Sequence, residues 1–588
     1  MVGKHDGDTL EAICGRSDAK RLLQPPRGRL ATSGCGPRLL LGLGAVGLMA
    51  CLSGGSAHAQ ITSTATTGVS ANWTALSWDN GIPGGQAGDV ANANSSASVT
   101  ITIDQPLTLR TLNHTQSTGA NVIFNASGGS TVTFDSGQVG TNASLFFTRS
   151  NGDSLAMKLN APVVLNSTLD AAWGRVQNRE MGFGGVISGV GGLNVNYASV
   201  GLNGSGHIFR FGDQSTTSPN TFSGGTSLTT RNSGFTTVKF QAYKAGAFGT
   251  GPLTLATAAV DIREFDQTVG GLGGGAGASK ISSLSNTAGT TTLTMNFADS
   301  AGPFSFSGAI QAGGSARIVA VTKQGSGFQT LSGINTYTGP TSVLGGVLAI
   351  ASAGSLNNTS GVTVNGVNAV FRYDSATPLV APLTLTQGTL TGTGTIASAV
   401  VAGSGSRLSP GNSPGIQAFS NGLQLAGLGS YLWEIGSAAG TLGTGWDLID
   451  VTGGVLDLSG LDGGAASTKY ALDLMTLDGA TPGPMAGYDP AQSAAFQVFR
   501  TAAGGVLLPG SVTALGGEDV TGLFSLTTGG WANTLPSGGF EMRVSAGGTG
   551  IDLVSVVAVP EPASLAVAAG GLAALGLLFH RRRRSARS

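Results

Sequence analysis

The sequence predicts an all-β protein built from many short strands. Apolar residues alternate with Thr, Ser and Asn, as at Val99, Ile101 and Ile103, and this alternation is typical of half-buried strands. The chain contains 97 glycines, and only 10% of its 588 residues are charged, against roughly 25% in ordinary globular domains. Short strands joined by glycine-rich turns fit this composition. We find no convincing helical periodicity before residue 559.

Internal repetition favours a solenoid, a stack of similar coils, over a series of sandwiches. Residues 336–343 and, more loosely, residues 221–228 each hold a glycine-containing turn that leads into a strand. Each is followed by a small apolar segment. Recurrence of one such unit indicates stacked repeats, because a single unit cannot bury its apolar face alone.

Residues 322–339 carry the most specific repeat. They read TKQGSGFQTLSGINTYTG and resemble the autotransporter-associated β-strand repeat, whose usual form is T-K-x-G-x-G-x-x-T-L-x-G-x-N-T-Y-T-G. Residues 410–415, 431–435 and 446–447 are similar to the C-terminal part of that family. The resemblance is strong over the repeat itself and loose over much of the remaining chain.

This resemblance implies a right-handed parallel β-helix across residues 60–425. Each coil would bury Val, Ile, Leu and Phe, and about 20–25 residues per coil would give roughly 15–18 coils. Residues 426–558 are richer in Asp and Trp. We interpret them as a C-terminal β capping region, because the open end of a solenoid needs cover against edge pairing.

Residues 1–59 are predicted to be a signal peptide. Arg38 precedes an apolar run, residues 39–52, and the small residues Ala57 and Ala59 complete an A-x-A cleavage site before Gln60. A basic segment, an apolar segment and small residues in this order are typical of secretory leaders. We therefore expect the Sec translocon as a partner and a mature chain that begins at Gln60.

All three cysteines lie in this predicted leader, at Cys14, Cys35 and Cys51. The mature chain is therefore expected to have neither a disulfide nor a thiolate metal site. An alternative interpretation treats residues 48–51 as a lipobox with Cys51 lipidated. Met49 fits that motif poorly, and Cys51 comes late in the apolar run.

The C-terminal residues 559–588 are predicted to sort and anchor the protein. A Pro-Glu-Pro signal precedes an uncharged apolar run, residues 563–579, and then a cluster of arginines. A run of about 17 residues is at the lower limit for one transmembrane helix, and the arginines would stay in the cytoplasm. The segment resembles the PEP-CTERM sorting signal of Gram-negative bacteria, which implies an exosortase-type membrane protease as partner. A plain tail anchor is the alternative. The sorting-signal residues are Val559, Pro560, Glu561, Pro562, Arg581, Arg582, Arg583 and Arg584.

Charge argues against nucleic acid as a partner. Residues 60–580 contain 26 acidic and 18 basic residues, so this part of the chain lacks the basic surface that nucleic-acid binding requires. Two histidines lie between the predicted leader and the predicted tail, His114 and His207, and they have no carboxylate-rich neighbourhood. We therefore predict no metal site and no cofactor.

No catalytic residue is predicted. Residues 411–415 match G-x-S-x-G, but that nucleophile motif needs a downstream histidine. The histidine that follows is His580 in the tail, so a plain turn is favoured. Asp447, Asp450 and Asp457 alternate with apolar residues and are expected to face solvent. The lysines are scattered along the sequence, at Lys158, Lys239, Lys244, Lys280, Lys323 and Lys469.

These observations predict an exported cell-surface or extracellular-matrix protein with an adhesive or structural role, associated with exopolysaccharide or biofilm. Trp73, Trp78 and Trp173 are candidates for stacking on sugars, although burial in the core is favoured. Two alternatives stay open. One is a polysaccharide-degrading β-helix enzyme, and the other is an ice-binding β-helix, suggested by the threonines of residues 384–386 and 389–395.

Overall fold

In the computed structural model, all described residues belong to the unit that begins at His58. The predicted leader up to residue 58 and the predicted sorting segment 559–588 lie outside the described residues, so Ala57, the sorting-signal residues and the apolar run 563–579 stay predictions. Ala59 and Gln60 are exposed at the start of the described part. The structure describes residues 59–116, 121–149, 156–174, 180–198, 208–213, 217–230, 239–314, 316–356 and 358–558.

The largest sheet, called sheet A, has 19 strands. Neighbouring strands are mostly parallel, as where Leu169 of β12 lies opposite Leu193 of β15; β46 pairs antiparallel with β45. The strands of sheet A are β1 (Thr62–Thr67), β3 (Val90–Ser95), β6 (Thr111–Gln116), β9 (Ala143–Arg149), β12 (Leu169–Gly174), β15 (Leu193–Ala198), β17 (Thr226–Thr230), β19 (Leu253–Ala256), β22 (Leu272–Ala276), β25 (Phe304–Phe306), β28 (Phe328–Leu331), β31 (Gly346–Ile350), β34 (Ala369–Tyr373), β36 (Gly388–Gly392), β39 (Ser406–Pro410), β42 (Ser430–Ile435), β45 (Tyr470–Asp478), β46 (Thr481–Pro482) and β50 (Phe524–Gly530).

A second sheet of ten parallel strands, called sheet B, accompanies the first half of sheet A. Its strands are β2 (Ala71–Asn72), β4 (Val99–Ile103), β7 (Val122–Ala126), β10 (Met157–Leu159), β13 (Glu180–Phe183), β16 (Ile208–Phe211), β18 (Lys239–Ala242), β20 (Ala259–Asp261), β23 (Lys280–Ser282) and β26 (Ala309–Gln311). A two-stranded sheet continues the pattern, with β29 (Ile334–Asn335) and β32 (Ser355–Leu356).

The third side is formed by two sheets, called C and D, and a last sheet, called F, follows near residue 395. Sheet C holds β5 (Leu107–Leu109), β8 (Val132–Phe134), β11 (Val163–Leu165) and β14 (Ile187–Gly189). Sheet D holds β21 (Gln267–Val269), β24 (Gly289–Asn296), β27 (Arg317–Gln324), β30 (Thr341–Val343), β33 (Val362–Val364), β35 (Leu383–Leu385), β38 (Val400–Ala402), β41 (Leu423–Leu425), β44 (Leu456–Asp457), β48 (Val506–Leu508) and β49 (Val512–Thr513). Sheet F holds β37 (Thr395–Ile396), β40 (Ile416–Phe419), β43 (Leu448–Val451), β47 (Ala495–Thr501), β51 (Phe540–Val544) and β52 (Gly550–Ser555).

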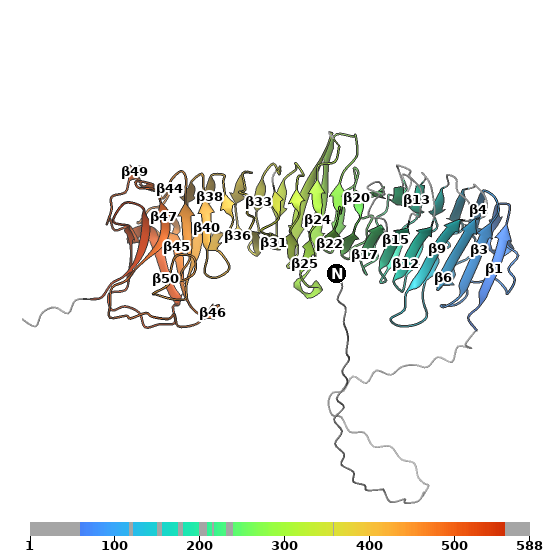
Figure 1. Ribbon diagram of the computed structural model, residues 1–588, viewed down its shortest axis with the longest axis horizontal. Helices are drawn as coiled ribbons and strands as arrows, with labels where there is room; N and C mark the ends of the chain where they lie inside the picture. The colour runs from blue at the N-terminus through green and yellow to red at the C-terminus, as the bar shows by residue number, and fades with distance from the viewer. Residues whose placement is uncertain are drawn as a thin grey trace, which may run out of the picture. The chain divides into compact units, whose positions relative to one another are not determined.

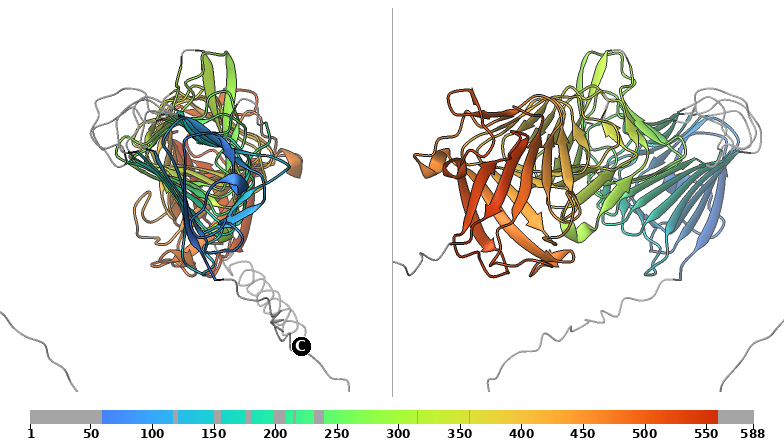
Figure 2. Two further views of the ribbon diagram at one scale, coloured as in Figure 1. Left: turned by 90° about the vertical axis from the view of Figure 1, so that its right-hand side faces the viewer. Right: turned by 60° about the vertical axis from the view of Figure 1, so that its left-hand side comes forward.

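The chain visits the sheets in a fixed order and then returns to sheet A. After β9 in sheet A come β10 in sheet B and β11 in sheet C, and the next strand, β12, pairs in parallel with β9. Figure 1 shows strands in sequence order from blue to red, and the left view of Figure 2 shows them around a common interior. This all-β arrangement of mostly parallel strands in long sheets is compatible with the predicted β-helix. The described residues contain no α-helix, and hence none that could cross a membrane.

Alternation along each strand places a ladder of apolar side chains inside. Along sheet B, Met157 lies opposite Met181, followed by Phe209, Phe240 and Val260, and all five are buried. Each inward position thus repeats from coil to coil. Burial of such side chains stabilises the fold by roughly 1.5–3 kcal/mol each relative to exposure.

Two of the three tryptophans proposed to stack on sugars belong to this core. Trp73 and Trp173 are 0% exposed, so neither ring presents a face to a ligand. Trp78 is half-buried, and its ring lies 4.7 Å from that of Trp73. The indole N–H of Trp73 donates to the Pro83 carbonyl, which satisfies its one polar group inside the core.

The first strand of sheet A has a covered edge. Asp79 accepts a 2.7 Å hydrogen bond from the Thr64 backbone N–H, and the Asn80 side chain donates to the Thr62 carbonyl. These side chains occupy backbone groups of β1 that would otherwise be free to pair with another chain. The Thr64 N–H is also the largest cause of a lowered pKa of Asp79.

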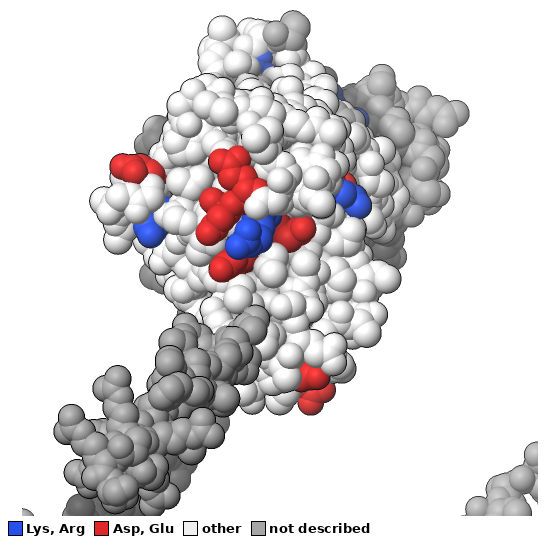
Figure 3. Space-filling view, turned by 90° about the vertical axis from the view of Figure 1, so that its left-hand side faces the viewer, with Lys and Arg blue, Asp and Glu red and all other residues white. Residues whose placement is uncertain are grey.

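The parallel stacking continues beyond residue 425. β42 pairs in parallel with β45, and β45 with β50, whereas β47, β52 and β51 pair antiparallel. The boundary predicted between a repeat region and a cap at residue 425 stays a prediction. Figure 3 views the end formed by the last strands, where acidic and basic side chains gather near the centre of a largely uncharged surface. In β51, Arg543 pairs with Glu541.

Candidate functional site

Four cations that are far apart in the sequence share the outer face of sheet B. Lys158 is in register with Gly182 and then with Arg210, and Lys239 is in register with Ala259 and then with Lys280. Strands lie about 4.8 Å apart, so the members of each pair are separated by roughly 9.6 Å. Lysines that are scattered along the sequence thus meet on this face. We call Lys158, Arg210, Lys239 and Lys280 the basic strip.

Two hollows lie along the basic strip. Lys158, Arg210, Asp213 and Tyr243 are among the residues that line a cavity of about 380 Å³. Lys239 and Lys280, with Asp261, Ser282 and Gln311, help to line a second cavity of about 230 Å³. Both hollows are partly open, and their walls contain both polar and apolar groups.

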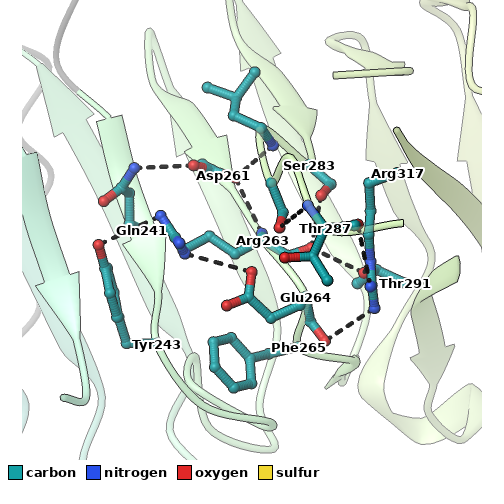
Figure 4. Close-up of polar contacts among 12 residues, drawn as sticks. Gln241, Tyr243, Asp261, Arg263, Glu264, Phe265, Ser283, Thr287, Thr291 and Arg317 are labelled. Carbon is teal, nitrogen blue, oxygen red and sulfur yellow. Dashed lines mark hydrogen bonds and ion pairs between the residues drawn. The ribbon is translucent and has the colours of Figure 1, made fainter. Parts of the chain in front are cut away.

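A network of polar contacts supports the strip at the corner between sheets B and D (Figure 4). The Tyr243 ring lies between two guanidinium groups, 4.3 Å from that of Arg210 and 4.7 Å from that of Arg263. Arg263 also pairs with Glu264 at 3.6 Å, and the Glu264 carbonyl accepts a hydrogen bond from Arg317. Cation–π contacts of this kind hold Arg210 against a fixed ring.

Asp261 stabilises the fold at the corner between sheets B and D. Its side chain accepts hydrogen bonds from Gln241 Nε2 at 2.9 Å and from the backbone N–H groups of Arg263 and Leu284 at 3.0 and 2.8 Å. The residue is 1% exposed. Because these donors already occupy both of its oxygens, the carboxylate holds neighbouring segments of the fold together. It is not placed to exchange a proton with a ligand.

Two other lysines, Lys244 and Lys323, are buried. Lys244 Nζ donates to the Gly185 carbonyl at 3.2 Å. Lys323 Nζ donates to the carbonyls of Gln324 at 2.6 Å, Gly325 at 3.1 Å and Gly345 at 3.3 Å. Burial lowers the pKa of each ammonium group to about 8. The lysine of the T-K-x-G motif therefore ties neighbouring turns together.

Replacing Lys323 with methionine is expected to lower the free energy of unfolding by about 1–3 kcal/mol, because three carbonyls lose their donor. Urea unfolding of the full chain, followed by circular dichroism, measures this. Lys469→Met is the matched control: the half-buried Lys469 side chain should change stability by no more than about 0.5 kcal/mol. Equal stability of both variants would contradict the bracing role of Lys323.

The three aspartates predicted to face solvent have structural partners. Asp447 and Asp450 are buried, at 0% and 9% exposure, which makes that prediction wrong for both residues, whereas Asp457 is half-buried. Asp450 accepts a 2.9 Å hydrogen bond from Arg500 Nε, and Asp457 accepts bonds from the Gln424 side chain and the Ser459 N–H. Each of the three carboxylates pairs with a different partner in the stacked strands, so the three do not form a catalytic cluster.

Asp447 joins three segments that are distant in the sequence. Its two carboxylate oxygens accept hydrogen bonds from the backbone N–H groups of Gly415 at 2.7 Å and Glu434 at 3.1 Å, and its carbonyl accepts one from Trp433 Nε1. Burial raises the pKa of Asp447 to about 8 and also raises that of Glu434. Sequence reasoning did not select Glu434, although it lies in the segment 431–435 that carried the family resemblance.

Residues 411–415 form a turn, with a cis peptide bond before Pro414. Gly411 and Gly415 approach so closely that a Cβ on either would lie 2.3 Å from the other's Cα. Glycine is therefore required at both positions by the packing of the turn itself. The Ser413 side chain hydrogen-bonds to Glu434, so the expected plain turn also positions the Asp447 region.

His114 is buried and engaged with its surroundings. Its Nδ1 contacts the Ala93 carbonyl, and its Nε2 lies 3.3 Å from Ser95 Oγ. Burial lowers the pKa of His114 to about 4, so the ring is neutral at ordinary pH. Among the described residues, no three His, Cys, Asp or Glu side chains are grouped to hold a metal; His207 lies outside those residues.

The threonine rank relevant to ice binding runs along sheet D. Register aligns one outward residue per strand from β21 to β35: Thr268, Thr294, Thr322, Ser342, Thr363 and Thr384. The next outward positions are unlike one another and include Asp266, Leu344 and Asn365. The rank is one side chain wide, whereas the T-x-T pattern requires two.

The fold and these sites together define a structural class. This is an all-β protein of stacked, mostly parallel strands, in which the polar residues of the repeat satisfy the backbone. Asn335, for example, donates to the Gly333 and Ser355 carbonyls and accepts from the Ile310 N–H. On the basic strip, charged side chains and hollows coincide.

Comparison with known proteins agrees with this class. Residues 321–350 match the family described as Passenger-associated-transport-repeat, which confirms the repeat predicted at residues 322–339. The chain is also similar to a protein named Adhesin BmaC autotransporter from Brucella suis biovar 1 (strain 1330), with 30% identity over 222 residues. That similarity spans 35% of this chain and 6% of the relative. No solved structure matches.

Proposed function

We propose that this chain is an exported surface protein with an adhesive or structural role, associated with exopolysaccharide or biofilm. The observation that carries the proposal is the long stack of parallel strands containing a passenger-type repeat at residues 321–350. The named adhesin with which it shares 222 aligned residues gives further support. A stack of this kind presents similar outward groups at every coil, so weak contacts can sum along it.

The route to the surface is part of the proposal. The leader, residues 1–59, would direct the chain through the inner membrane by the Sec translocon. The apolar run 563–579 would hold it there transiently, in a Gram-negative cell, until an exosortase-type protease acts near Pro560, Glu561 and Pro562. The right-handed sense of the coil and its capping by residues 426–558 belong to this proposal as well.

Changing the four arginines at 581–584 to alanine is expected to abolish processing and leave the precursor in the inner membrane. The apolar run would lack the charge that keeps its end in the cytoplasm. Fractionation and immunolabelling of intact cells measure the surface pool. The matched control changes Arg587 to alanine and should be processed normally. Surface release of the four-arginine variant at the normal level would contradict the sorting role.

Adhesion itself is tested on cells that carry or lack the gene. Loss of the protein should reduce attachment or matrix retention, and restoring the wild-type chain should return it. Normal attachment by cells without the protein would overturn the adhesive proposal.

The basic strip favours one second candidate, cleavage of an acidic polysaccharide. Incubating the protein with such a chain and assaying new sugar ends decides between binding and cleavage.

A further inference from the structure

We propose that the basic strip on sheet B binds an acidic polysaccharide, laid across the strands from β10 to β23. The inference rests on the proposed function and names the ligand class and the site. Between residues 60 and 580 acidic residues outnumber basic ones by 26 to 18. Against this background, Lys158, Arg210, Lys239 and Lys280 place positive charges on the outer face of four of the six strands from β10 to β23.

Lys239 and Lys280 are the centre of the site. The Lys280 side chain is exposed and that of Lys239 is half-buried, and neither ammonium group has an ion-pair or hydrogen-bond partner among the described residues. They are separated by Ala259, whose small side chain leaves the space between them open. Two cations without intramolecular partners on one polar hollow are suited to anionic groups of a ligand.

The floor of the strip carries neutral polar groups between the charges. Ser282 and Gln311 line the hollow of about 230 Å³ together with the two lysines, and can pair with sugar hydroxyls. Asp261 also lines this hollow and is held by three hydrogen bonds from neutral donors. Its single negative charge leaves the two lysines in excess, so the hollow keeps a net positive charge. The contacts of Tyr243 with Arg210 and Arg263 fix the Tyr243 and Arg210 side chains, which line the neighbouring hollow of about 380 Å³.

The spacing of the charges favours an acidic glycan over nucleic acid. Register places Lys239 and Lys280 two strands apart, or roughly 9.6 Å. Phosphates are much denser, at one charge per about 3.4 Å along each strand of DNA. Sparse cations separated by hydrogen-bonding side chains match a chain with one acidic group every one or two sugars. The acidic remainder of the protein would also repel a dense polyanion.

The test measures binding of fluorescently labelled oligogalacturonate to the full-length protein by fluorescence anisotropy at low salt. Lys239→Gln combined with Lys280→Gln should raise the apparent Kd about tenfold, and added salt should weaken wild-type binding. The matched control, Arg110→Gln with Lys469→Gln, removes two charges from other parts of the chain and should change the Kd less than about twofold. Circular dichroism checks that each variant is folded, and Lys280→Gln alone replaces the pair if the double variant is not.

An unchanged Kd in the strip variant would overturn the proposal. So would an equal loss in the control, which would indicate attraction without a site, or equal binding of neutral dextran. Displacement of the glycan by duplex DNA of comparable affinity would assign the strip to nucleic acid instead. Because this assay uses purified protein, it can fail while cells still display the protein and adhere, and it can succeed when they do not.

Discussion

Replacing Trp173 with alanine is expected to lower the free energy of unfolding by about 3–5 kcal/mol, the usual cost of removing a large buried aromatic ring. The ring is 0% exposed and lies 4.7 Å from Phe209, 5.6 Å from Phe147 and 5.9 Å from Phe183. These partners come from three other strands, β16, β9 and β13, and two of those strands, β9 and β16, belong to the neighbouring coils, so the loss extends beyond β12. Coils that cannot bury their apolar face alone depend on such contacts.

Urea unfolding and hydrogen–deuterium exchange of the full chain measure this effect. Exchange should increase in β9, β12 and β15, the neighbouring strands of sheet A. Trp173→Phe keeps much of the volume and should cost less, and Trp78→Ala, at a half-buried ring, provides a matched control. If Trp173→Ala kept wild-type stability but bound sugar more weakly, Trp173 would stack on sugars and would not be a core residue.

The sequence was sufficient for the all-β class, the parallel stacking and the repeat at residues 322–339. Period-two alternation reports directly which side chains face inward, as Val99, Ile101 and Ile103 do. The alternation can be recognised within a single strand, and it recurs along the sequence because every coil must bury the same face. Motif residues such as Lys323 were recognised by pattern, but their role as bonds between turns required the positions of the surrounding carbonyls.

The basic strip could not be predicted in the same way. Lys158, Lys239 and Lys280 meet on one face only because their strands occupy equivalent positions in coils of unequal length. Turn lengths between sheets vary, so spacing in the sequence does not give register. Few residues of this chain are charged, so these lysines look isolated in the sequence. Stacking of strands at about 4.8 Å places them on one face of sheet B.

Asp447 is the second case that needed the fold. Alternation with Leu448 and Val451 suggested an outward position, but the residue precedes β43, and its carboxylate turns inward to the N–H groups of Gly415 and Glu434. No local pattern reports donors supplied by segments that far away. Two buried N–H groups without an acceptor would be costly, and this requirement overrides the tendency of a carboxylate to face water.

The stability of this region is expected to fall as the pH rises from about 5 to about 8. In the unfolded chain Asp447 ionises near its ordinary pKa of 3.8, whereas burial raises the folded pKa to about 8. The folded state therefore binds more protons between these values. The stabilisation linked to protonated Asp447 is complete below about pH 4 and is lost as the pH approaches about 8. The raised pKa of Glu434 acts in the same direction.

Asp447→Asn should flatten this pH dependence. It should also lower the free energy of unfolding at pH 5 by about 1–3 kcal/mol, because an amide can accept from only one of the two backbone N–H groups. The measurement is the urea midpoint at pH 5 and pH 8, with exchange followed in β42 and β43. Asn412→Ala, an exposed and uncharged change in the adjoining turn, is the control and should keep the wild-type slope. If Asp447→Asn retained that slope as well, Asp447 would be ionised in the fold, held by its two N–H donors against the cost of burial.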